Sequence, residues 1–355
     1  MAYTTIDNPE LYFQCKIWSG NATDDTSITL DGSENMQPDF IWTKRRNAST
    51  NHDLWDAVRG ALKQIASNNT EAEASISSSV KSFNSDGFTV GTNTNLNASG
   101  GTYVAWCWKE SATAGFDIVS YTGNGSNRTI SHSLSAVPKI MIHKDRDNAS
   151  YMWGVYHHTL GNQKNLNLNS NGAANVDSGG VYYNSTTPTS SVFSLGTNIG
   201  YNKSSDNYIS YIFAEKQGFS KFGSYTGNGN ADAPFIYTGF KPAMVILKET
   251  TTSGQWYIFD NKRNTFNLMT GALFPDLGNA ETTDNAIDFY SNGFKGRKTS
   301  SDLNTSGNNH IYMAFAESPF VNSNGVPCNA RWLNKITKLI RGEVHYEGAT
   351  NYDYM

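Results

Sequence analysis

Short runs of aromatic and β-branched residues recur along the chain, and Gly, Asn, Ser and Pro separate them. Within residues 103–108 large side chains alternate with smaller ones, which is the period-two pattern of a β-strand. Residues 208–213, 243–248 and 256–260 are equally short and have a similar composition. Asn-Gly and Asp-Gly pairs between such runs favour tight turns. The pattern therefore predicts an all-β protein.

One short motif occurs three times, at intervals of about a hundred residues: WSGNA at 18–22 and YTGNG at 121–125 and 225–229. Other landmarks keep this spacing. A proline is followed by an apolar run and a lysine, and an asparagine stands six residues before each closing strand. The positions that define the repeat are Trp18, Tyr121 and Tyr225, Gly20, Gly123 and Gly227, and Asn97, Asn202 and Asn304.

This spacing predicts three tandem β-sandwich units of the jelly-roll or concanavalin-like kind. We place an N-terminal arm at 1–14, the units at 15–112, 115–216 and 217–320, and a C-terminal extension at 321–355. Almost no linker separates the second unit from the third, which predicts a fixed relative orientation.

Composition narrows the function. Charged residues make up 16%, the net charge is −4, and there is no long basic run, so nucleic acid is not expected as a partner. No apolar run is long enough to cross a membrane, and residues 1–8 lack the pattern of a secretory signal. Three cysteines without paired spacing indicate neither a disulfide framework nor a zinc site, and no cofactor is expected.

The repeated motifs resemble a known family when they are taken together. The YTGNG opening, DAVRG at 56–60, NSDGF at 84–88 and NASGGTYVAWCW at 97–108 are similar to a repeat domain of unknown function found in virion and tail proteins of marine bacteriophages. The resemblance covers roughly residues 11–320, and the second copy lacks the Asp-Arg-Gly and Asp-Gly-Phe stretches. It implies a structural or receptor-binding role in the particle, with other virion proteins as partners and a homo-oligomer, such as a trimer.

Residues shared by all three copies are interpreted first as requirements of the fold. Trp18, Tyr121 and Tyr225 could stack on sugars, but core or turn packing is the simpler interpretation. The repeated asparagines are expected to bond their own backbone in a turn. Lysines 44, 144 and 248, at strand ends, are expected to extend their ammonium groups into solvent.

Differences between the copies are better guides to binding. Residues 175–191 place Tyr182, Tyr183 and Asn184 among small polar residues, which is typical of an adaptable recognition loop. These three residues and Tyr151 are the candidate contacts for a host glycan. The alternative is a solvated loop with one tyrosine turned inward.

The C-terminal extension breaks the β pattern. A short amphipathic helix is predicted over about 330–341, with Trp332, Ile336, Leu339 and Ile340 on one face and Arg331 and Lys335 mainly off it. The helix either packs on the last unit or docks on another virion protein or a second copy of the chain.

We therefore expect a phage virion protein at the particle surface, in the tail as a fibre or adhesin component, after synthesis in the host cytoplasm. A capsid decoration protein is one alternative. A polysaccharide depolymerase is another, and it would need two carboxyl groups at a set separation. Glu110, Glu215 and Glu317 recur at the ends of the units, and Asp56 and Asp260 recur in two of them. No constant pairing joins these acids, so catalysis is not expected.

Overall fold

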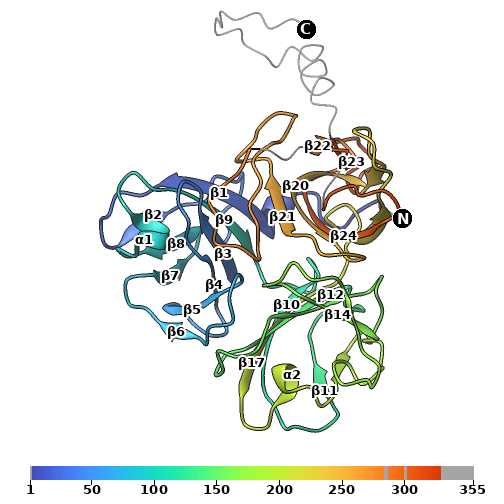
Figure 1. Ribbon diagram of the computed structural model, residues 1–355. Helices are drawn as coiled ribbons and strands as arrows, with labels where there is room; N and C mark the ends of the chain where they lie inside the picture. Colours follow the sequence, from blue (N-terminus) through green and yellow to red (C-terminus); the bar gives the residue numbers. More distant parts are fainter. Residues whose placement is uncertain (1, 284–286, 300–301, 329–355) are drawn as a thin grey trace, which may run out of the picture.

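The structure is a computed structural model that describes residues 2–283, 287–299 and 302–328. Nearly all of its regular elements are antiparallel β-strands (Figure 1). Three short helices complete them: η1 (Pro9–Leu11), α1 (Thr94–Asn97) and α2 (Ile199–Asn202). Among the described residues, no helix has the length and apolarity that a membrane crossing requires.

Three larger sheets form the centre of the molecule. Sheet I has the order β1-β9-β3-β4-β5-β6, sheet II the order β10-β17-β12-β13-β14-β15, and sheet III the order β18-β24-β20-β21. The strands of sheet I are β1 (Phe13–Ser19), β3 (Phe40–Arg45), β4 (His52–Asp56), β5 (Lys63–Ala66), β6 (Ala74–Ser75) and β9 (Thr102–Trp108). Those of sheet II are β10 (Phe116–Thr122), β12 (Ile140–Asp145), β13 (Gly154–His157), β14 (Lys164–Asn167), β15 (Asn175–Val176) and β17 (Asn207–Phe213). Those of sheet III are β18 (Ser220–Thr226), β20 (Phe240–Glu249), β21 (Trp256–Asp260) and β24 (Asn309–Pro319).

Each larger sheet has a smaller one on its outer side (Figure 1). Beside sheet I lie β2 (Thr26–Ile28), β7 (Val80–Asn84) and β8 (Gly87–Val90). Beside sheet II lie β11 (Arg128–Ser131) and β16 (Val192–Leu195), and beside sheet III lie β19 (Phe235–Tyr237), β22 (Ile287–Tyr290) and β23 (Gly293–Gly296). Separate apolar clusters fill the space between each larger sheet and its smaller neighbour.

In every larger sheet, the first strand of the repeat pairs with the last. Trp18 lies opposite Tyr103, Tyr121 opposite Tyr208, and Tyr225 opposite His310. The two rings of each pair stack, with centroid separations of 5.2, 5.1 and 4.8 Å. The repeated aromatic residue therefore occupies the same topological place three times.

The repeated asparagines join distant segments. The Oδ1 atoms of Asn97, Asn202 and Asn304 accept from the backbone N–H groups of residues 21, 124 and 228, at 2.9–3.0 Å. The Asn97 amide also donates to the carbonyl oxygens of residues 23 and 91. The expectation of a bond within the asparagine's own turn is therefore wrong, because each side chain holds the start of a repeat against its end.

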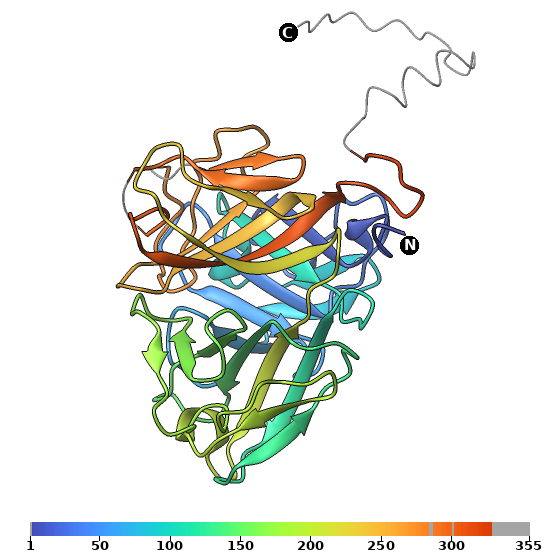
Figure 2. The same ribbon diagram turned by 90° about the vertical axis from the view of Figure 1, so that its right-hand side faces the viewer.

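The larger sheets share a core that a string of separate units would not have. One continuous cluster of buried residues includes Trp42 and Trp106 of sheet I, Ile142 of sheet II, and Ile246 and Met313 of sheet III. Figure 1 and Figure 2 show the three larger sheets grouped closely around this common core. Each larger sheet is therefore buried on both faces, with its own small sheet on one side and the other two larger sheets on the other.

Two parts of the chain are expected from the sequence to lie outside the three repeats, namely the segment at the N-terminus and the C-terminal extension. The segment before β1 packs on the body: Thr4 is buried, and its hydroxyl donates to the carbonyl oxygen of Gln217 at 2.8 Å. The predicted helix at about 330–341, with Trp332, Ile336, Leu339, Ile340, Arg331 and Lys335, lies outside the described residues. The described Cys15, Cys107 and Cys328 are free thiols.

Candidate functional site

The larger sheets meet in pairs, and we call these contacts seam I/II, seam II/III and seam III/I. One main-chain hydrogen bond recurs at all three. It joins residue 73 to residue 146, residue 174 to residue 250, and residue 281 to residue 46, with lengths of 2.8, 3.0 and 2.8 Å. The three seams are thus built to one plan, and their side chains can be compared position by position.

At seam I/II a buried ionic network fills the contact. Asp56 and Arg59 form an ion pair whose side chains are fully buried, and the Tyr211 hydroxyl of sheet II donates to the Asp56 carboxylate at 2.7 Å. Glu73 bridges Arg59 at 3.4 Å and Arg146 of sheet II at 2.9 Å. Burial opposes the charge on Glu73, but the two guanidinium groups lower its pKa below the usual value.

Seam III/I repeats this network with its own residues. Asp260 and Arg263 form the fully buried ion pair, and the Trp106 indole of sheet I donates to the Asp260 carboxylate at 3.0 Å. Glu281 lies 3.4 Å from Arg263 and also pairs with Arg46 of sheet I. Both seams therefore have two arginines, one aspartate and one glutamate in matching places.

Seam II/III lacks all of these charged groups. His157 stands where the other seams have aspartate, Leu160 and Thr250 stand in place of the two arginines, and Ala174 replaces the glutamate. At the position of Tyr211 and Trp106, seam II/III has Met313, which lines the same cavity as His157.

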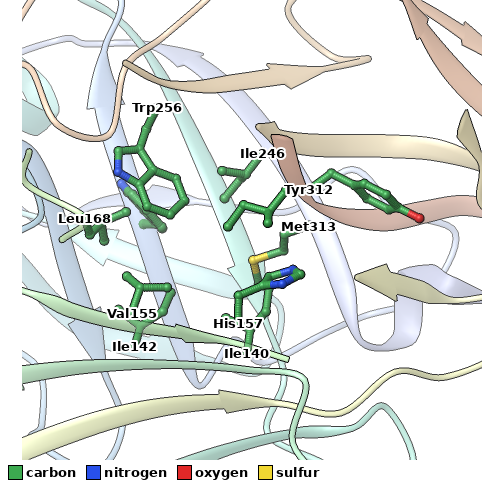
Figure 3. A pocket seen from close by; sticks show the side chains of 11 residues that line it. Ile140, Ile142, Val155, His157, Leu168, Ile246, Trp256, Tyr312 and Met313 are labelled. Atoms are coloured by element: carbon green, nitrogen blue, oxygen red, sulfur yellow. The ribbon is translucent and has the colours of Figure 1, made fainter. Parts of the chain in front are cut away.

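The first consequence is a small internal cavity of about 20 Å³ beside His157 (Figure 3). Its other described walls include the apolar side chains of Ile142, Val155, Ile246 and Met313. Burial lowers the pKa of His157 to about 3, so the imidazole is neutral at physiological pH.

The second consequence is an open cleft of about 480 Å³, which is within the size range of small-molecule sites. Leu160, Ala174, Val176 and Ile311 form its apolar part, and all of these except Val176 belong to the shared core or pack against it. Hydroxyl and amide groups and one ammonium group supply its polar part. The described lining is Thr159, Leu160, Lys164, Ala174, Val176, Ser224, Thr250, Thr251, Asn309 and Ile311.

Other contacts hold seam II/III together around this cleft. The Trp256 indole donates to the carbonyl oxygen of residue 167 at 3.0 Å, as the Trp153 indole does to that of residue 66 across seam I/II. The ammonium of Lys248 donates to the carbonyl oxygen of residue 171, and that of Lys144 to the carbonyl oxygen of residue 70. These bonds therefore hold sheets II and III together at the seam in which the cleft lies.

The repeated lysines are buried, so the expectation that they extend into solvent is wrong. Lys44, Lys144 and Lys248 have no exposed surface, and all three ammonium groups donate to backbone carbonyl oxygens. Burial lowers the pKa of each to about 8. The Lys144 and Lys248 ammonium groups each donate across a seam, whereas that of Lys44 donates to nearby residues of its own repeat.

The tyrosine loop predicted as a glycan contact lies elsewhere, over sheet II. Tyr183 is fully buried in the cluster between sheet II and its small sheet, and its hydroxyl donates to Asn165 at 3.0 Å. Its ring is therefore not available to a ligand, as in the alternative of an inward tyrosine. Tyr182 packs on Tyr183 and Tyr201, whereas Asn184 is exposed. Tyr151 has the Lys203 ammonium 5.9 Å from its ring centre.

The acids considered for catalysis have other partners. Glu215 pairs with Lys221 and Glu317 with Lys241, each at 2.7 Å. Glu110 instead faces Asp117, and burial together with this second carboxyl raises the pKa of Glu110 to about 7. Among the described residues, no cluster of His, Cys, Asp or Glu is placed to hold a metal ion.

Comparison with protein families supplies one match. A family model described as "Domain of unknown function (DUF7483)" matches residues 8–319. The chain belongs to the DUF7483 family. This match spans all three larger sheets and ends at the last residue of β24. A comparison with curated proteins found no match.

The cleft was missed from the sequence, although one signal for it was visible. The second copy was seen to lack the Asp-Arg-Gly stretch, and the cleft lies where that arginine and its glutamate partner would be. The composition of residues 175–191 favoured the tyrosine loop as the binding segment instead. The absence of an arginine from the second copy predicts a cleft only when it is known which residue of the neighbouring copy that arginine would contact.

Proposed function

We propose that this protein is a surface component of a bacteriophage particle, located in the tail as a fibre or adhesin, and that it binds the host surface. We also propose that its fold consists of three β-sandwich units of one ancestry. The repeated order and register of the larger sheets supports this, as does the smaller sheet packed on each of them.

The observation that carries the binding role is the cleft at seam II/III. Two seams built on the same plan are filled by buried ion pairs, whereas the third opens a cleft of about 480 Å³. A scaffold closed on two sides and open on the third suits recognition of a ligand at one place. The proposed location in the virion rests on the resemblance of the repeated motifs to phage tail and virion domains.

The cleft favours binding over hydrolysis of a polysaccharide. Glycoside hydrolysis in its usual form uses two carboxyl groups that flank the bond to be broken. The described lining of the cleft has no aspartate or glutamate. A ligand held there would meet hydroxyl, amide and ammonium groups, which can orient it but supply no acid and base pair of that kind.

Immunogold labelling of intact particles, from the phage whose genome encodes this chain, tests the proposal. Labelling of the tail, together with weaker host adsorption after antibody treatment, is the expected result. Label confined to the head would identify the capsid decoration alternative. Purified particles that do not contain the polypeptide would refute a virion role altogether.

A further inference from the structure

The cleft contains one cationic side chain, that of Lys164, but lacks the carboxylate that faces the matching lysine at seam I/II. At seam I/II, Lys63 lies 3.8 Å from the Glu73 carboxylate and donates to the Ser75 hydroxyl at 2.7 Å. Lys164 occupies the matching place on β14, opposite Val176 where β5 has Ser75. Ala174 and Val176 therefore stand where the two partners of Lys63 would be.

The described lining of the cleft therefore has a single positively charged side chain, that of Lys164. Thr250 takes the place of Arg146, which removes the second cation that the matching glutamate would have contacted. Among the described residues, Lys164 has no carboxylate partner within ion-pair distance. One anionic group in the place of the missing glutamate carboxylate would give Lys164 the ion-pair partner that Lys63 has in Glu73.

The other residues that line the cleft indicate what kind of molecule would carry that anionic group. Ser224, Thr250, Thr251 and Asn309 present hydroxyl and amide groups, which can both donate and accept. The Thr250 hydroxyl donates to the carbonyl oxygen of residue 309 at 3.0 Å and keeps its lone pairs for a further donor. Leu160 and the exposed Val176 supply apolar contact beside these polar groups.

We infer that the cleft at seam II/III binds an acidic saccharide, with one carboxylate paired to the Lys164 ammonium and the sugar hydroxyls bonded to the Thr250, Thr251 and Asn309 side. A uronic acid matches this lining because it has one carboxylate and several hydroxyls on a ring with apolar C–H faces. This inference rests on the proposed binding role and names its ligand class and its place.

Titration of the whole chain with a galacturonic acid trimer and with a galactose trimer, followed by ligand-observed NMR, tests the inference. The two probes differ in their carboxylates. We expect the acidic trimer to bind at least about tenfold more tightly, with an advantage that decreases as salt is added. Lys164→Gln should remove that advantage. Lys63→Gln is the matched control, because it removes the equivalent lysine at the filled seam and should leave binding unchanged.

A second variant refills the cleft with the groups found at the other seams. Ala174→Glu combined with Thr250→Arg should abolish binding of the acidic trimer while the melting temperature stays the same or rises. Equal binding of the two trimers, no binding of either, equal effects of the two lysine variants, or full binding by the refilled variant would each overturn the inference. These outcomes are separate from the particle labelling: a tail-located protein with an inactive cleft keeps the proposed location and loses this ligand.

Discussion

Removal of the Arg59 side chain tests whether the ionic networks hold the larger sheets together. In Arg59→Leu the guanidinium is lost from a fully buried ion pair, and the buried Asp56 carboxylate keeps only two neutral partners, the Tyr211 hydroxyl and the backbone N–H of residue 59. The same guanidinium donates to the carbonyl oxygens of residues 54 and 63, at 3.1 and 2.9 Å. Breaking a buried ion pair from one side costs about 3–5 kcal/mol in the free energy of unfolding.

The chain itself offers a sharper comparison, because the sheets pack together at seam II/III without the network. Asp56→His, Arg59→Leu, Glu73→Ala and Arg146→Thr together replace the four charged residues of seam I/II by their counterparts at seam II/III, with Tyr211 kept. This fourfold variant should be less destabilised than Arg59→Leu alone, since no buried charge is left unpaired. It should also open a second cleft.

Chemical unfolding followed by tryptophan fluorescence measures these differences. Lys81→Met is the control, because it removes a cation from a pair of exposed aspartates, and it should leave the midpoint nearly unchanged. A shift of the midpoint by Arg59→Leu no larger than that of this control would show that the ionic networks do not hold the sheets together. A fourfold variant that is the least stable of the set would contradict the predicted cost of an unpaired buried charge.

Three further predictions concern single positions. Gly123→Ala should destabilise by about 1–3 kcal/mol in the same unfolding assay, because its Cβ would lie 2.2 Å from the carbonyl oxygen of residue 203, whereas Gly172→Ala, with room for a Cβ, should be near neutral. Burial lowers the pKa of His143 from 6.5 to about 3, so its contribution to stability is complete above pH 6.5 and is lost as the pH falls toward 3; His143→Leu should flatten that decline by about 1.4 kcal/mol per pH unit. Of the three thiols, Cys328 alone should react with a thiol reagent in the native protein, since the other two are buried, and rapid labelling of two or three would contradict the described packing.

Individual strands could be predicted from the sequence because the alternation of large and small side chains is typical of β-strands. Residues 103–108, read as a strand, lie within β9, and the repeated aromatic positions occupy equivalent places in three sheets. The burial of both faces was not predicted. A signal existed in the continuous apolar run of residues 243–247, since strands buried on both faces lose their alternation.

The site was less predictable than the strands, for a physical reason. A lysine at a strand end looks alike whether it is solvated or buried against carbonyl groups, so Lys44 and its counterparts were placed wrongly. The tyrosine loop was chosen on composition, which does not say which ring enters a core. Identifying the cleft required knowing that the glutamate of one copy contacts the arginine of the next.

The recurring main-chain bond between neighbouring sheets has a consequence for how this family can vary. Each of the three repeats donates one such bond to one neighbour and accepts one from the other, so the circuit is complete after three steps. A fourth copy would have no unsatisfied partner to join, and a lost copy would leave two others exposed. We therefore expect relatives to change in the side chains at each seam rather than in copy number.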